Sequence, residues 1–163
     1  MKDLKTKKIR PFALAGCIAL PLAIGGLSAL ITSDAMSRYG SLTKPFLSPP
    51  GWLFPVVWTG LYAMMGIASY LVITSEGRIR EKERSLIIYA GQLLLNFCWS
   101  ILFFKYSMYF PAFLWLVVMW LMIILCTTEF FRINKTAGIL MIPYILWTTF
   151  AAYLNLAVYL LNR

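Results

Sequence analysis

The stretch FPAFLWLVVMWLMIILCTT, residues 110–128, contains no charged side chain. A helix over 110–130 rises about 1.5 Å per residue and so crosses the roughly 30 Å hydrocarbon core of a lipid bilayer. Four more stretches of the chain combine a similar length with the same lack of charge. The sequence therefore predicts five membrane-spanning helices, over 11–31, 53–74, 86–104, 110–130 and 137–160.

The overall composition agrees with a chain that is surrounded mainly by lipid. Hydrophobic residues make up 61% of the sequence and charged residues 13%, and the mean hydropathy is +0.76. A soluble domain has about 45–50% apolar and 25% charged residues. Because five spans take up most of the 163 residues, we predict an all-α membrane protein. The whole chain, 1–163, would form a single five-helix bundle domain.

The basic residues lie in short segments beside the apolar stretches, which is typical of topology signals and lipid headgroup contacts and disfavours nucleic acid as a partner. Five of the 15 lie in 1–10, four in 75–85 and two at Arg132 and Lys135, whereas the other four lie between the alternate spans or at the C-terminus. This bias predicts a cytoplasmic N-terminus, an outer 32–52 loop and an outer C-terminus. In a bacterium, the host membrane would be the cell membrane.

The spans contain few groups that could carry catalytic chemistry. Their interiors lack acidic and basic side chains, which disfavours a proton-coupled transporter. The chain has no histidine, and its three cysteines lie in three different spans. We therefore expect no metal site, no histidine-based triad and no bound cofactor. The segment 75–85 mixes both signs of charge and is interpreted as a solvated connector.

Aromatic, amide and small residues recur every four positions on three of the predicted helices, and so share one face of each. Packing and interfacial belts account for many such aromatics, and hydrogen bonds between helices account for such amides. However, three helices that each offer a ring beside a small or polar residue would also suit a large planar ligand. The three sets are Phe54, Trp58 and Tyr62; Gln92, Asn96 and Ser100, with Trp99 and Phe103 adjoining; and Trp147, Ala151 and Asn155.

Three ordered motifs resemble the tryptophan-rich sensory protein/translocator protein family, TspO/MBR. They are KPFLSPPGWLFPVVWTGLY at 44–62, NFCWSILFF at 96–104 and PYILWTTFAAYLN at 143–155. They are similar to the signature loop with the second helix, the third helix and the fifth helix of that family. The resemblance covers roughly residues 11–162. Gly40 and Leu47 depart from the usual family residues, and the first helix matches poorly.

The resemblance implies a membrane receptor or sensor that binds porphyrins such as protoporphyrin IX, sterols, and benzodiazepine- or isoquinoline-type compounds under the first loop. Two alternatives remain open: a light- and oxygen-dependent enzyme that degrades porphyrin through Trp58 and Trp147, and a transporter of the same ligands. Carried over by motif position, the ligand-binding residues would be Tyr39, Pro49, Phe54, Trp58, Tyr62, Asn96, Ser100, Trp147 and Ala151.

The family resemblance also implies a homodimer. Ala15, Ala19 and Ala23 form a ridge of small residues on the first predicted helix, and Ala90-Gly91 form a small patch on the third. Close approach of membrane helices requires such surfaces, which could equally pack within one bundle. The resemblance favours the third helix as the dimer face.

Overall fold

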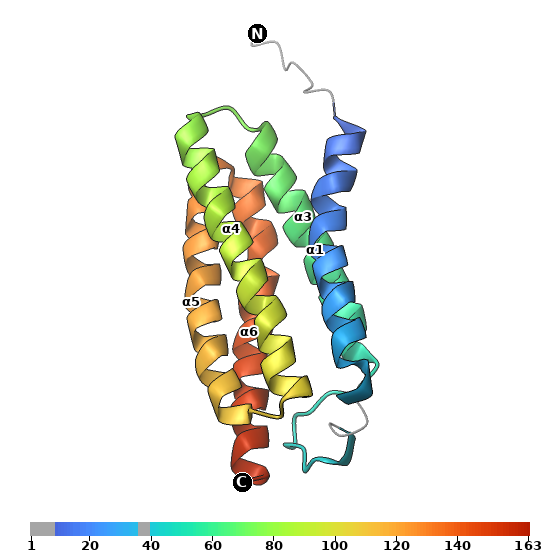
Figure 1. Cartoon of the computed structure of the whole chain (residues 1–163). Helices are drawn as coiled ribbons and strands as arrows, with labels where there is room; N and C mark the ends of the chain where they lie inside the picture. Colours follow the sequence, from blue (N-terminus) through green and yellow to red (C-terminus); the bar gives the residue numbers. More distant parts are fainter. Residues whose placement is uncertain (1–8, 36–39) are drawn as a thin grey trace.

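The computed structural model describes residues 9–35 and 40–163. In this part of the chain, five long helices run side by side in alternating directions (Figure 1), and each is long and apolar enough to cross a membrane. This arrangement confirms the predicted all-α, five-helix membrane fold. The helices are α1 (Pro11–Thr32), α3 (Leu53–Thr74), α4 (Ile79–Ser100), α5 (Tyr109–Ile133) and α6 (Lys135–Leu161).

The start of α4 differs most from the sequence prediction. The predicted span begins at residue 86, whereas the helix begins at Ile79, inside the segment that was interpreted as a connector. Arg78 and Glu81 form an exposed ion pair at 3.8 Å across this first turn, and the Lys82 ammonium donates to the backbone oxygen of Ser75. The charges therefore mark where the helix leaves the hydrocarbon, and the backbone is already helical before that point.

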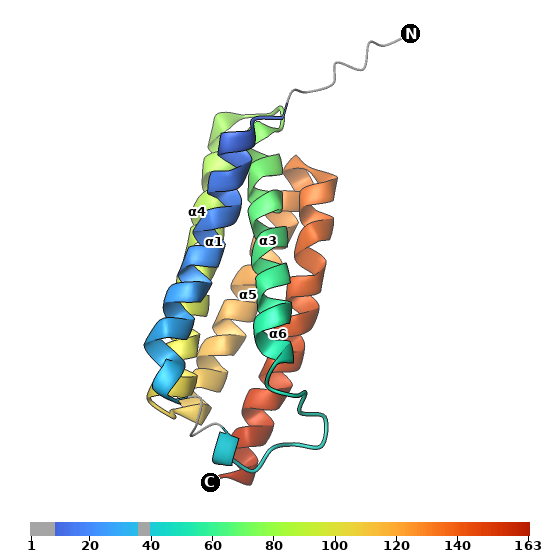
Figure 2. The ribbon, with the colours of Figure 1, turned by 90° about the vertical axis from the view of Figure 1, so that its right-hand side faces the viewer.

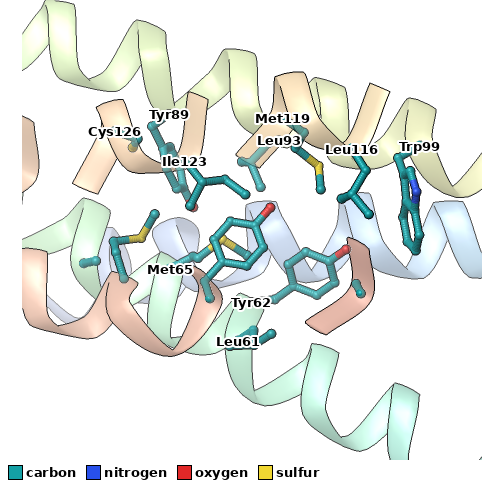
Figure 3. Packing of buried hydrophobic residues seen from close by; sticks show 14 of the residues in the cluster. Leu61, Tyr62, Met65, Tyr89, Leu93, Trp99, Leu116, Met119, Ile123 and Cys126 are labelled. Carbon is teal, nitrogen blue, oxygen red and sulfur yellow. The ribbon is translucent and has the colours of Figure 1, made fainter. Parts of the chain in front are cut away.

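Large apolar side chains fill the centre of the bundle. Met65 of α3, Leu93 of α4 and Leu116, Met119 and Ile123 of α5 are almost fully buried and lie close together (Figure 3). Apolar side chains also cover the outside of the helices, as expected for a surface that faces lipid. In lipid, association of helices depends on close packing and hydrogen bonds, because lipid tails are as apolar as the core.

The backbones of α1 and α3 come close together at Gly66. A Cβ atom on this residue would lie 2.5 Å from the Cα atom of Ile18 and 2.7 Å from the backbone oxygen of Cys17. The two helices therefore meet backbone against backbone at this point. Only a residue without a side chain permits this distance.

Most of the described basic residues lie at the end of the bundle where α1 begins (Figure 1), together with the α3–α4 connector. At this end Glu129 of α5 is buried, and its carboxylate oxygen accepts from Arg84 at 3.3 Å and from Arg132 at 2.9 Å. The Arg84 pair joins α4 to α5, and the two pairs together neutralise a carboxylate that would otherwise be costly near hydrocarbon. Lys44, Lys105 and Arg163 lie at the opposite end, at the level of the first loop and the C-terminus.

Because basic residues are concentrated at the end where α1 begins, we still predict that the N-terminus is cytoplasmic. Two single-cysteine variants, Phe46→Cys and Arg80→Cys, would test this orientation in a protein from which the three native cysteines have been removed. Both positions are exposed, and they lie at opposite ends of the bundle. In intact cells, a membrane-impermeant maleimide should label position 46, and position 80 should react only after permeabilisation. The reverse pattern would show a cytoplasmic first loop.

Candidate ligand-binding site

A cavity of about 390 Å³ lies in the half of the bundle opposite to the start of α1. The second half of α1, the first half of α3, the end of α4 and the second half of α6 surround it. Seven of its lining residues are aromatic, and most of those on the side of α1 are small. The rings are those of Phe54, Trp58, Tyr62, Trp99, Phe103, Phe104 and Trp147.

Trp58 lies at the centre of the aromatic wall. Its ring centroid is 5.5 Å from that of Tyr62 and 6.4 Å from that of Trp99, at interplanar angles of 31° and 34°. Phe54, one turn before Trp58 on α3, meets Trp147 of α6 edge to face at 6.0 Å. These separations lie in the favourable range for aromatic pairs, about 4.5–7 Å. The rings of α3, α4 and α6 therefore hold one another in place around the space.

A π-helical segment, η2 (Ile101–Lys105), continues α4 and shapes this wall. The backbone N–H of Tyr106 donates to the carbonyl of Ile101 at 3.1 Å, five residues back. Phe103 and Phe104 both belong to this segment, and both line the cavity. Phe103 also stacks on Trp99 at 5.6 Å. Single π turns occur often at functional sites.

A chain of buried hydrogen bonds lies behind the cavity. The Tyr62 hydroxyl donates to Asn96 Oδ1 at 2.8 Å, and Asn96 Nδ2 donates to the Tyr144 hydroxyl at 3.0 Å. Tyr144 in turn donates to Gln92 Oε1 at 2.9 Å. This chain joins α3, α4 and α6. The chain holds the Tyr62 ring on the side away from the cavity. The amides of Gln92 and Asn96 therefore stabilise the packing of the bundle and do not line the cavity.

A second polar contact fixes Trp99. Its indole Nε1 donates to Asn155 Oδ1 at 3.1 Å, and Asn155 Nδ2 donates to the backbone oxygen of Tyr109 at 2.7 Å. By contrast, Trp147 Nε1 is buried, and no acceptor among the described residues pairs with it. A buried donor without a partner costs about 1–3 kcal/mol. Trp147 therefore lines the cavity with its ring and keeps a buried N–H without a partner among the described residues.

The first loop is tied to the end of α6 (Figure 2). The backbone N–H of Thr43 donates to Asn162 Oδ1 at 3.0 Å, and Asn162 Nδ2 donates to the carbonyl of Thr43 at 2.9 Å. Gly51, at the other end of this loop, lines the cavity. The loop thus lies at the same end of the bundle as the cavity.

The structure brings most of the sequence-predicted ligand-binding residues together. Asn96 is 1% exposed and lies behind the Tyr62 ring, outside the lining. Pro49 is half-buried in the first loop and is also not among the lining residues. Tyr39 lies outside the described residues. The predicted residues that do line the cavity are Phe54, Trp58, Tyr62, Ser100, Trp147 and Ala151.

The sequence interpretation missed the contribution of α1. Gly25 has no side chain, and the Tyr62 ring occupies the space where a Cβ atom would lie. The cluster of small residues at 25–29 is the signal that could have indicated this wall. The lining residues missed on α1 are Leu22, Gly25, Gly26, Ser28, Ala29 and Thr32.

The fold and the cavity define an integral, multi-pass membrane protein with an aromatic, ligand-sized site between its helices. A sequence profile of the TspO/MBR family matches residues 17–161. The chain belongs to this family.

Several relatives have similar lengths as well as similar sequences. The chain is 39% identical over 150 residues to the tryptophan-rich protein TspO of Chlorobaculum tepidum. The aligned region covers 91% of this chain and 95% of that protein. It is 37% identical to the tryptophan-rich sensory protein of Cereibacter sphaeroides, with coverage of 91% and 88%. It is 32% identical to the translocator protein of Homo sapiens, with coverage of 81% and 79%.

Proposed function

We propose that this protein is a membrane receptor or sensor that binds protoporphyrin IX and other large, flat, apolar molecules in the aromatic cavity. Sterols and benzodiazepine- or isoquinoline-type compounds belong to the same class of ligand. The observation that carries the proposal is the aromatic wall, to which α3, α4 with η2, and α6 each contribute rings. Rings stacked on a planar ligand contribute roughly 0.5–1.5 kcal/mol each beyond the buried area.

The size and the open side of the cavity are compatible with such ligands. Its volume of about 390 Å³ is at the lower end of the range for ligand pockets, about 300–1,000 Å³. Gly26 and Ala29 of α1 and Pro55 of α3 line the cavity and are also exposed. A tetrapyrrole larger than the enclosed space would therefore extend outward between α1 and α3.

Titration of the purified protein with protoporphyrin IX in neutral detergent, followed by absorption and fluorescence in the dark, tests the proposal. A receptor should show saturable binding at one site with the porphyrin preserved. Porphyrin uptake that does not saturate, or that equals partition into empty micelles, would contradict it.

A light-dependent, porphyrin-degrading enzyme is the second candidate, because the indoles of Trp58 and Trp147 line the same cavity. In this reaction oxygen is the oxidant, and the tryptophans would take part in opening the macrocycle. Illumination in air would separate the two functions. Bleaching that requires both tryptophans favours the enzyme, and an unchanged spectrum favours the receptor.

Metal-free porphyrin should bind at least as tightly as haem. Haem iron is usually held by a His, Cys, Met or Tyr side chain, and Tyr62 is the one cavity-lining residue of these types among the described residues. Its hydroxyl already donates to Asn96. Dissociation constants for protoporphyrin IX and haemin should be measured in the same detergent. Haemin binding tenfold more tightly, about 1.4 kcal/mol, would contradict this prediction.

The proposal extends to assembly as a homodimer. Ile87, Ala90 and Leu94 are exposed on one side of α4, and Ala15 and Ala19 are exposed on α1. Both small-residue patches are therefore accessible to a second copy, with α4 the expected dimer face. Mass measurements in several detergents and in bilayers should find a dimer. A monomer under all these conditions would contradict the proposal.

A further inference from the structure

A second cleft, of about 910 Å³, lies at the opposite end of the bundle from the aromatic cavity. The start of α1, the end of α3 and the first turns of α4 form its walls. The residues with the most distinctive chemistry in these walls are Arg10, Phe12, Tyr70, Ile73, Ser75 and Lys82. None of them contributes to the aromatic cavity.

Two cations from different elements meet in this cleft. Arg10 precedes the first turn of α1, and Lys82 lies on α4. Among the described carboxylates, none lies within 4.0 Å of either charged group. The Lys82 ammonium donates to the backbone oxygens of Ser75 and Ile73 at the end of α3. These bonds hold the positive charge at the wall and leave it without an acidic partner.

The buried side of the cleft adds hydrogen-bond donors. The Tyr70 side chain is 8% exposed, and its hydroxyl oxygen accepts from the backbone N–H of Arg10 at 3.0 Å. The hydroxyl hydrogen has no acceptor among the described residues. No side chain caps the start of α1. Each of these groups is a cation or a donor, so together they match an anion with several acceptor oxygens.

Apolar surface continues from the charged groups. Phe12 is 93% exposed and Ile73 is 44% exposed, and both line the same cleft. α1 begins at Pro11 and α3 ends at Thr74, so the cleft lies at the level where two spans end. An anion alone would use the polar wall only, whereas an amphiphile with a charged head and an apolar tail would use both.

We propose that this cleft binds the phosphate of an anionic phospholipid headgroup, with an acyl chain lying along Phe12 and Ile73. Basic pockets between membrane helices hold such headgroups through the same combination of charge and donors. The sequence adds four lysines against one aspartate within residues 2–8, next to Arg10. Their charge raises the local concentration of anionic lipid around the cleft.

Binding of phosphatidylglycerol and phosphatidylcholine to the full-length protein, measured by native mass spectrometry from neutral detergent, tests the proposal. The variant is Arg10→Gln with Lys82→Gln, because glutamine can still donate to the backbone oxygens of Ser75 and Ile73. The matched control is Arg78→Gln with Arg80→Gln, two exposed cations at the same end that do not line the cleft. Thermal unfolding of each variant checks that it is folded.

Phosphatidylglycerol should bind wild type and control with affinities within about twofold, and the cleft variant about tenfold or more weakly. Phosphatidylcholine should bind weakly to all three. An equal loss of phosphatidylglycerol affinity in the cleft variant and the control would mean that the lipid responds only to overall positive charge, which would overturn the proposal. Equal binding of the two lipids would overturn it as well. Inorganic phosphate that competes at the same concentration as phosphatidylglycerol would indicate a free-anion site instead of a lipid site.

Discussion

Replacing Trp58 and Trp147 together by phenylalanine should weaken protoporphyrin binding by roughly tenfold. Both indoles line the aromatic cavity, and Trp58 also contacts Tyr62, Trp99 and Tyr144. Phenylalanine keeps a ring at each position but has less stacking area. It also removes the Trp147 N–H, a buried donor without a partner among the described residues. If the protein degrades porphyrin in light, the same variant should lose that reaction.

The matched control is Trp115→Phe with Trp120→Phe. These tryptophans lie on α5 and do not line the cavity. Each donates one hydrogen bond, from Trp115 to the backbone oxygen of Leu95 at 2.9 Å and from Trp120 to Thr149 at 2.8 Å. The control therefore loses two indoles and two hydrogen bonds without changing the site, and its affinity should stay within about twofold of wild type. Equal weakening in both double variants would show that the tryptophans act through stability alone.

The fold was predictable because lipid imposes a strong constraint on sequence. Length and lack of charge located all five spans, because an apolar stretch of about 20 residues crosses hydrocarbon as a helix that satisfies its own backbone. The start of α4 was not predictable in the same way. The charged side chains of residues 80–84 are mostly exposed to water beyond the hydrocarbon, and this polarity says nothing about whether their backbone is helical.

The lining of the aromatic cavity was predictable where it consists of side chains spaced regularly along one helix. The spacing of four along α3 places Phe54, Trp58 and Tyr62 on one face, and all three line the cavity. The same spacing could not separate Ser100, which lines the cavity, from Asn96, which is sealed behind Tyr62. That difference depends on how neighbouring helices pack.

Two further features of the site have no periodic signal. The α1 wall consists largely of small residues, which leave room for the cavity. The sequence of α1 alone does not show where neighbouring helices leave such room. The π-helical η2 segment changes the direction of Phe103 and Phe104 relative to a regular helix. Periodicity assumes regular geometry, so it does not reveal this change.

Gly66→Ala should lower the free energy of unfolding by about 1–3 kcal/mol, which is the usual range for overpacking a close contact. The new Cβ atom would lie 2.5 Å from the Cα atom of Ile18 and 2.7 Å from the oxygen of Cys17. Both are backbone atoms of α1, so no side-chain rotation can relieve the clash. The helices must move apart, and the packing and dispersion contacts along their whole interface weaken.

Gly60→Ala is the control because it makes the same chemical change on the same helix. Gly60 is exposed, and a Cβ atom there would have no neighbour within 4 Å. In a helix interior, alanine is favoured over glycine by about 1 kcal/mol, so this variant should be as stable as wild type or more stable. Thermal or denaturant unfolding in one detergent, followed by circular dichroism, gives the comparison.

The porphyrin affinity of Gly66→Ala should also fall, because α1 carries one wall of the cavity as well as the close contact at Ile18. Separation of α1 from α3 would pull Gly25 away from the Tyr62 ring and widen the open side of the site. Gly60→Ala should leave the affinity unchanged. If Gly66→Ala were as stable as Gly60→Ala, α1 and α3 would not meet backbone to backbone in the protein. In that case the α1 wall of the cavity would have to be placed elsewhere.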